Sequence, residues 1–194
     1  MRFPNVVLDL PGWVEEFLPD PDQSYPTREK RMRLVIELSR LNVGHGTGGP
    51  FGAGIFDLST NRLIAPGVNL VTSTNLSTAH AELVSIMIAQ QVVGSFDLGG
   101  PGRPDYELVA STEPCSQCFG SIPWSGVRHL VCGARDEDAR SIGFDEGPKM
   151  PDWASALEER GISVVCDVCR EEAASVLRDY AEGGGAIYNA RQGS

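Results

Sequence analysis

The apolar positions of this 194-residue chain alternate between helical and extended spacing from Thr27 onward. Between Thr27 and about Leu41 they recur three and four positions apart, which predicts a helix with Thr27 as its N-cap. Two short apolar runs follow at residues 51–58 and 63–65, separated by the turn residues Ser59-Thr60-Asn61. Two apolar runs joined by such a turn predict a β-hairpin.

The second half of the chain repeats this alternation. Thr78 predicts the start of a helix that holds His80 and Glu82 in its first turns. A second short helix opens with Cys115 and Cys118. The remaining expected elements are strands at 106–111, 128–133 and 162–165 and helices at 155–160 and 170–181. Strands that alternate with helices predict an α/β layered sheet.

Two terminal segments fall outside the alternation. Residues 1–26 contain five prolines together with Trp13 and Phe17, which predicts an irregular arm packed on the rest of the protein. Three successive glycines from Gly183 separate the last helix from the end of the chain. We therefore expect an N-terminal arm (1–26), one domain (27–182) and a C-terminal tail (183–194).

The charge balance narrows the classes of partner. The chain has 26 acidic and 16 basic residues and a formal net charge of −10, which argues against binding to a nucleic-acid backbone. We interpret its basic cluster, residues 28–33, as a solvated helix face. The sequence has no apolar run long enough to predict a membrane span. Five cysteines and the absence of a signal-peptide pattern predict reduced thiols and a cytoplasmic location.

Two motifs contain the candidate chemistry, His80-Ala81-Glu82 and, 35 positions past His80, the segment from Pro114 to Cys118. His80, Cys115 and Cys118 offer one imidazole and two thiolates. A structural zinc site normally has four protein ligands, whereas a catalytic zinc keeps one position for water. Glu82 is close enough in sequence to move protons to and from that water. The motifs therefore predict one Zn²⁺ per chain and hydrolytic chemistry.

The combination of H-x-E with P-C-x-x-C is typical of zinc-dependent nucleobase deaminases. The alternative is that His80 is an ordinary helix residue and that the two cysteines are small buried apolar side chains. Cys166 and Cys169 form a second C-x-x-C. The 48 positions between Cys118 and Cys166 are too many for a zinc ribbon, so we expect the second pair to pack among apolar residues.

Further segments extend the two motifs. They are Gly49-Pro50-Phe51, Asn69, Glu113, Phe119-Gly120, Trp124-Ser125-Gly126-Val127-Arg128, Ile142-Gly143-Phe144-Asp145-Glu146-Gly147-Pro148 and Ile187-Tyr188-Asn189-Ala190-Arg191. With these segments the chain resembles the cytidine deaminase-like superfamily over nearly its whole length after the arm. Within that superfamily it is most similar to the bacterial guanine deaminases of the same fold.

The resemblance implies a fold, an assembly and a ligand. The implied fold is a three-layer α/β/α sandwich with a mixed five-stranded sheet, and the implied assembly is a homodimer. Zinc would be held by His80, Cys115 and Cys118, with Glu82 as proton shuttle and Glu146 as a second catalytic acid. The implied partner is a small-molecule purine base, and we expect neither nucleic acid nor membrane as a partner.

The resemblance also implies substrate contacts, at Phe51, Asn69, Ala81, Phe144, Asp145 and Tyr188. Asn69 would hydrogen-bond the purine, Phe51 and Phe144 would contact its ring, and Tyr188 would belong to a tail that closes as a lid. Simpler readings remain open for these residues. Asn69 could cap a turn, the two phenylalanines could be core residues, residues 145–146 could be an acidic surface turn, and the tail could be a frayed end.

The leading functional hypothesis is hydrolytic deamination of guanine to xanthine and ammonia, a step of purine catabolism. The same site could serve guanosine or another nucleoside, cytosine, a pterin or an aminotriazine such as ammeline. The net charge of −10 disfavours editing of adenosine in transfer RNA. The hypothesis from another class is a binding module with a structural zinc, against which the intact Glu82 argues.

Overall fold

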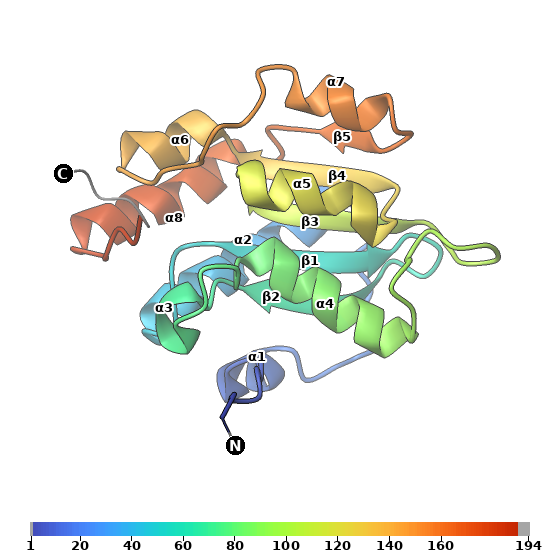
Figure 1. Ribbon diagram of the computed structural model, residues 1–194, viewed down its shortest axis with the longest axis horizontal. Helices are drawn as coiled ribbons and strands as arrows, with labels where there is room; N and C mark the ends of the chain where they lie inside the picture. The colour runs from blue at the N-terminus through green and yellow to red at the C-terminus, as the bar shows by residue number, and fades with distance from the viewer. Residues whose placement is uncertain (1, 190–194) are drawn as a thin grey trace.

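The computed structural model describes residues 2–189 and is organised around one mixed β-sheet of five strands (Figure 1). The strand order is β2-β1-β3-β4-β5. The strands are β1 (Gly52–Asp57), β2 (Arg62–Val68), β3 (Tyr106–Thr112), β4 (His129–Ala134) and β5 (Ser163–Val165). Strand β1 runs antiparallel to β2 and β3, whereas β3, β4 and β5 are parallel. The predicted mixed five-stranded sheet is therefore confirmed.

Helices cover both faces of this sheet, which makes the three layers (Figure 1). One face carries α4 (Ala81–Val93), α5 (Ser116–Ser125) and α7 (Trp153–Glu158), and the other carries α2 (Arg28–Gly44), α6 (Asp136–Ser141) and α8 (Arg170–Glu182). Two short helices, α1 (Gly12–Phe17) and α3 (Val71–Thr74), lie outside these layers. Within residues 2–189, the helices lack the combined length and apolar content needed to cross a membrane.

The core is divided in two by the alternation of side chains along the central strands. Ile55, on β1, and Leu108, on β3, pack under α4 and α5. Their chain neighbours Phe56 and Val109 pack on the opposite face, under α2 and α8. Because both faces of these strands are covered, they read in the sequence as continuous apolar runs.

Most of the expected elements are present with ends shifted by one to three residues, but the sequence pattern missed three helices. These are α1, α3 and α6, each of six residues or fewer. A helix this short contains less than two turns, so its apolar positions do not repeat often enough to reveal the period. The predicted N-cap of α4 was wrong, because the cap is His80 and not Thr78.

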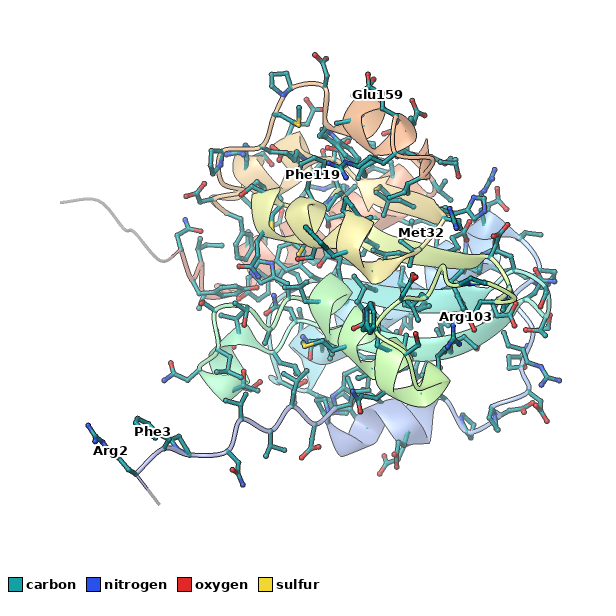
Figure 2. All side chains as sticks on the ribbon, turned by 45° about the vertical axis from the view of Figure 1, so that its right-hand side comes forward. Arg2, Phe3, Met32, Arg103, Phe119 and Glu159 are labelled. Carbon is teal, nitrogen blue, oxygen red and sulfur yellow. The ribbon has the colours of Figure 1, made fainter. Side chains whose placement is uncertain are left out.

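The N-terminal segment lies against the edge of the domain at β2. Trp13, Val14 and Phe17 pack in an apolar cluster with Leu38 and Val84, and an isolated bridge pairs residue 24 with residue 62 of β2. Figure 2 shows Arg2 and Phe3 at the far end of this segment, pointing away from the body of the protein. The part of the arm that contacts the domain is therefore centred on α1.

One residue of the basic cluster is not solvated. Arg31 is 5% exposed, and its Nε lies 2.6 Å from Oε1 of Glu107, which is 1% exposed on β3. Arg31 also donates to the carbonyl of Tyr25 at 2.9 Å. The interpretation of residues 28–33 as a solvated face is wrong at this position, because Arg31 faces the sheet and neutralises a buried carboxylate.

Replacing Arg31 with Met should lower the free energy of unfolding by about 3 kcal/mol, because it leaves the buried Glu107 with only the longer, 4.0 Å contact to the half-exposed Arg28. The matched control is Arg33→Met on the same helix. The ion pair of Arg33 with Glu172 is exposed, so its loss should cost less than about 1 kcal/mol. Urea unfolding of the two variants measures both values, and equal losses would contradict the assignment.

Candidate metal and substrate site

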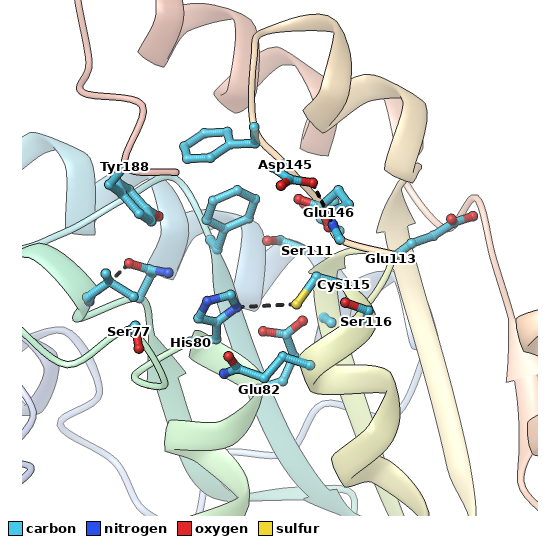
Figure 3. Close-up of a pocket in the computed structure, with 18 of the residues that line it drawn as sticks. Ser77, His80, Glu82, Ser111, Glu113, Cys115, Ser116, Asp145, Glu146 and Tyr188 are labelled. Carbon is cyan, nitrogen blue, oxygen red and sulfur yellow. Dashed lines mark hydrogen bonds between the residues drawn. The ribbon is translucent and has the colours of Figure 1, made fainter. Parts of the chain in front are cut away.

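A cavity of about 290 Å³ opens where β3 ends and where α4 and α5 begin. Figure 3 shows that His80, Glu82, Cys115, Glu146 and Tyr188 surround it. These residues come from segments more than 100 positions apart in the chain. The fold thus brings together, around one cavity, residues of the two motifs, of the segment that holds Glu146 and of the tail.

Three ligand atoms lie together on one side of the cavity. Nδ1 of His80 is 3.5 Å from Sγ of Cys115 and 3.6 Å from Sγ of Cys118, and all three atoms lie within 4.8 Å of one another. Tetrahedral zinc with ordinary Zn–S and Zn–N bonds separates sulfur from nitrogen by about 3.6 Å. The three side chains therefore fit one Zn²⁺, and they leave a fourth position for water.

The positions of these ligands follow from helix starts. His80 and Cys115 are the N-caps of α4 and α5 and have extended backbone conformations, with ψ of 152° and 173°. Because His80 precedes the helix, the helical rule that separates residues two apart does not apply to His80 and Glu82. Both side chains can therefore face the same cavity, which the sequence periodicity could not explain.

The environment of the two cysteines favours a thiolate before any metal binds. The pKa of Cys115 is lowered to about 4, mainly because Cys118 donates a hydrogen bond to it and also because His80 lies beside it. The pKa of Cys118 is raised by that same hydrogen bond and by burial. The pair thus holds one thiolate, and the N-terminus of α5 adds to its stabilisation.

Two carboxyl groups face the cavity next to these ligands (Figure 3). Burial raises the pKa of Glu82, and the charge of Cys115 raises it further. Glu146 is 6% exposed, and burial, followed by the charges of Cys115 and Glu82, raises its pKa to about 8. A carboxyl group with a raised pKa can both hold and release a proton near neutral pH.

The loop that holds Glu146 is fixed against the start of α5. The backbone N–H of Ser116 donates to the carbonyl of Glu146 at 3.0 Å. Lys149, at the end of the loop, lies 3.3 Å from Glu113 and 3.0 Å from Asp136. The surface-turn reading is therefore wrong for Glu146, although its neighbour Asp145 is exposed at the mouth of the cavity.

Three aromatic rings form one wall of the cavity. The ring of Phe144 lies edge-on to Phe51 at 5.0 Å and to Tyr188 at 5.1 Å. The hydroxyl of Tyr188 touches Gly49, since a Cβ there would lie 2.0 Å from it. This hydroxyl is buried and has no hydrogen-bond partner among the described residues. The phenylalanines are thus core residues and cavity residues at the same time.

The tail is joined to the Glu146 loop by Asn189. Its Nδ2 donates to the carbonyl of Gly143 at 2.8 Å, and its Oδ1 accepts from the N–H of Asp145 at 2.9 Å. The remaining residues of the tail motif, Ala190 and Arg191, lie outside the described residues. The last described residues of the chain therefore lie over the cavity.

Of the two remaining expected substrate contacts, Asn69 lines the cavity and Ala81 does not. Asn69 is buried and lines the cavity, and its Oδ1 accepts from the N–H of Val71 at 3.2 Å. It therefore caps a turn and keeps its amide nitrogen for the cavity. Ala81, the first residue of α4, is fully buried in the core, and its side chain does not line the cavity.

Sequence reasoning missed several polar residues of the cavity wall, among them Ser77, Ser111 and Gln117. Gln117 had a usable signal, because it lies between the two metal-binding cysteines at a helix start. Its Nε2 is buried without a partner among the described residues. Among residues 2–189, the metal cluster does not include Cys166 or Cys169, which are half-buried beyond β5.

Comparison with known proteins places this geometry in context. The guanine deaminase of Bacillus subtilis is 36% identical over 134 residues, which are 69% of this chain and 81% of that protein. A solved guanine deaminase from Nitrosomonas europaea has a TM-score of 0.87 and 41% identity, over 92% of this chain and 97% of that one. NE0047, solved with 2,6-diaminopurine, has a TM-score of 0.88 and 43% identity, over 96% and 97% of the two chains.

A family model, compared with the sequence alone, identifies the wider family. The model for the cytidine and deoxycytidylate deaminase zinc-binding region matches residues 26–134, more than half of the chain. The matched range includes His80, Glu82 and both cysteines of the metal cluster. The predicted resemblance and the predicted zinc-binding deaminase domain are thereby confirmed. This chain belongs to the cytidine and deoxycytidylate deaminase family.

Proposed function

We propose that this protein is a zinc-dependent aminohydrolase that converts guanine and water into xanthine and ammonia. The observation that supports this most strongly is the pairing of a three-ligand metal cluster with two buried carboxyl groups in one cavity. A structural zinc site has no use for two acids of raised pKa. The similarity to two solved structures, a guanine deaminase and NE0047 with a bound diaminopurine, supports a purine base as the ligand.

The two carboxyl groups divide the proton transfers between them. Zinc, held by His80, Cys115 and Cys118, supplies a Lewis acid that activates water at neutral pH. Glu82 accepts one proton from the attacking water and delivers it to N3 of the purine as the C2–O bond forms. Protonated Glu146 delivers a proton to the amino group as the C2–N bond breaks and ammonia leaves. It regains a proton from the C2 hydroxyl, which becomes the C2 carbonyl of xanthine. All atoms of water are thereby accounted for in xanthine and ammonia.

The rest of the cavity wall binds the base. The rings of Phe51, Phe144 and Tyr188 offer apolar contacts to a flat heterocycle. Asn69 lines the cavity and has its amide oxygen occupied by Val71, which supports a role for its amide nitrogen as a donor to the purine. Asp145 lies at the mouth, and Ala81 contributes through its backbone at the start of α4.

We further propose a homodimer of a cytoplasmic enzyme of purine catabolism. Trp124 on α5 is 85% exposed, and Phe96 after α4 is 83% exposed. A backbone hydrogen bond from Leu98 to Ser125 brings their two segments together. Contiguous exposed aromatic residues of this kind favour an interface. Thiol ligands that must stay reduced suit the cytoplasm.

Ammonia release measured across guanine, guanosine, cytosine, adenine and ammeline tests the substrate assignment. Guanine should give the highest kcat/KM, since the cavity matches a free purine base and has an apolar wall over it. Higher kcat/KM for any other member of this panel would replace guanine as the substrate. Absence of ammonia release from all five by zinc-loaded protein would favour the binding-module hypothesis.

Replacing Cys115 with Ala should remove bound zinc and activity, because it removes one of only three protein ligands. Zinc content by atomic absorption and ammonia release measure the two effects. Cys166→Ala is the matched control, since this thiol lies outside the metal cluster. Loss of zinc from Cys166→Ala protein would overturn the ligand assignment.

Glu82→Gln and Glu146→Gln should each retain zinc and lose turnover by roughly 10²–10⁴-fold, the contribution of positioned proton transfer. The pH profile of kcat/KM supplies an independent reading for Glu146. Because burial raises its pKa to about 8, the protonated acid persists to that pH and activity should fall above it. Glu159→Gln, on the surface, is the control. A near-normal rate for Glu146→Gln would remove that residue from the mechanism.

We propose the tail as a lid and the arm as a separate packed segment. A chain that ends at Gly185 lacks Tyr188 and Asn189, so it should lose at least about tenfold in kcat/KM for guanine, since water then enters the cavity. The preference for guanine over guanosine should also narrow. Guanine turnover equal to that of the full chain would contradict the lid.

A further inference from the structure

A buried amide on α2 is bonded to both segments that form the recognition side of the cavity. Asn42 is fully buried. Its Nδ2 donates to the carbonyl of Gly49 at 2.9 Å and to the carbonyl of Asn69 at 2.8 Å. Gly49 leads into Phe51, and Asn69 is the amide of the cavity wall. One side chain outside the cavity therefore links the backbones of the two segments that carry Phe51 and Asn69.

The orientation of Asn42 is set in turn from the N-terminal arm. Its Oδ1 accepts from the hydroxyl of Thr47 at 2.7 Å, and that hydroxyl accepts from Nε1 of Trp13 at 3.1 Å. The Trp13 ring is stacked on His45, with centroids 5.2 Å apart and planes 5° apart. Because a hydroxyl has one proton, accepting from Trp13 leaves that proton for Asn42. The hydrogen bonds thus run in one direction, from α1 to the cavity.

The effect at the cavity is on the direction of the Asn69 amide. The N–H of Val71 donates to Oδ1 of Asn69, and an amide nitrogen could not accept that bond. Nδ2 makes no hydrogen bond with the described residues, so it is available to the cavity that Asn69 lines. Its backbone carbonyl is held by Asn42. Gly48 packs directly against that carbonyl, since a Cβ there would lie 1.7 Å from the oxygen. Both the backbone and the side chain of Asn69 are therefore fixed.

We propose that Asn42, Thr47 and Trp13 are positioning residues that set the affinity for the purine by aligning Asn69. The inference rests on the proposed function, since it takes guanine as the ligand of Asn69. None of the three lines the cavity among the described residues, so their effect on the base passes through Asn69, whose carbonyl Asn42 holds. The arm, through Trp13, thereby belongs to the recognition apparatus.

Thr47 offers the sharpest test because valine has nearly its shape and lacks its hydroxyl. Thr47→Val should raise KM for guanine by roughly three- to tenfold, the range expected for hydrogen bonds of this kind, and should leave kcat unchanged. Thr47→Ser keeps the hydroxyl and should restore KM to within about twofold. Trp13→Phe keeps the stacked ring, loses the donor, and should raise KM in the same direction. Zinc content and thermal midpoint are measured on every variant.

A double variant shows whether Thr47 acts by positioning Asn69 or only by stabilising the structure. In an Asn69→Ala chain the amide to be aligned is gone, so adding Thr47→Val should change KM by less than about twofold. A merely structural Thr47 would raise KM by the same factor in both backgrounds. That outcome would overturn the proposal, and so would a fall in kcat without a change in KM.

Measuring guanine binding without turnover tests the positioning residues independently of the proposed reaction. Equilibrium dialysis with labelled guanine is carried out on Glu82→Gln protein, with and without Thr47→Val, and the dissociation constant should rise by the same factor as KM. Wild-type protein that binds guanine but releases no ammonia would overturn the reaction alone, and the dialysis would still decide the network. Absence of guanine binding would overturn both.

Discussion

The site depends on one spatial constraint, the convergence of two helix N-termini at the carboxyl end of β3. His80 caps α4 and Cys115 caps α5, and their ligand atoms come within 3.5 Å. The two helices lie on the same face of the sheet (Figure 1), where their positive ends favour thiolate. A shift of either helix along the sheet by a single turn, about 5 Å, would separate these atoms beyond the reach of one metal ion.

The same convergence brings several acidic side chains close to one another in the cavity. Cys115, Glu82 and Glu146 place three potential negative charges around one small cavity, away from water. Burial raises the pKa of both carboxyl groups, the charge of Cys115 raises both further, and the charge of Glu82 adds to the shift of Glu146. Bound zinc would offset part of this charge. Conformational freedom would relieve the repulsion, but Lys149 ties the Glu146 loop to Glu113. The acids therefore stay in place in the protonation states that proton transfer needs.

The residues proposed to bind the base lie on loops, on the tail and at the start of a strand, whereas the metal ligands lie at helix N-termini. The phenylalanines and Tyr188 come from a strand start, a loop and the tail, and Asn69 comes from the turn before α3. Such segments lack a ladder of backbone hydrogen bonds, so side-chain hydrogen bonds must hold them. Asn42 does this for the Gly49 and Asn69 segments, and Asn189 does it for the loop that holds Glu146. The precision of the binding wall thus comes from side-chain amides rather than from the sheet.

The amino-acid sequence by itself determined the α/β layered architecture, the metal ligands and Glu82, because these depend on local periodicity and on residue types at fixed spacing. The resemblance added Glu146, Asn69 and the aromatic residues, whose roles local pattern left open. Only the tertiary structure decided that Glu146 is buried while Asp145 is exposed, that Arg31 faces Glu107 across the core, and that Trp13 connects to Asn69 through Asn42. The physical reason is that burial and hydrogen bonding between residues far apart in the chain depend on how whole elements pack, and no local pattern encodes that packing.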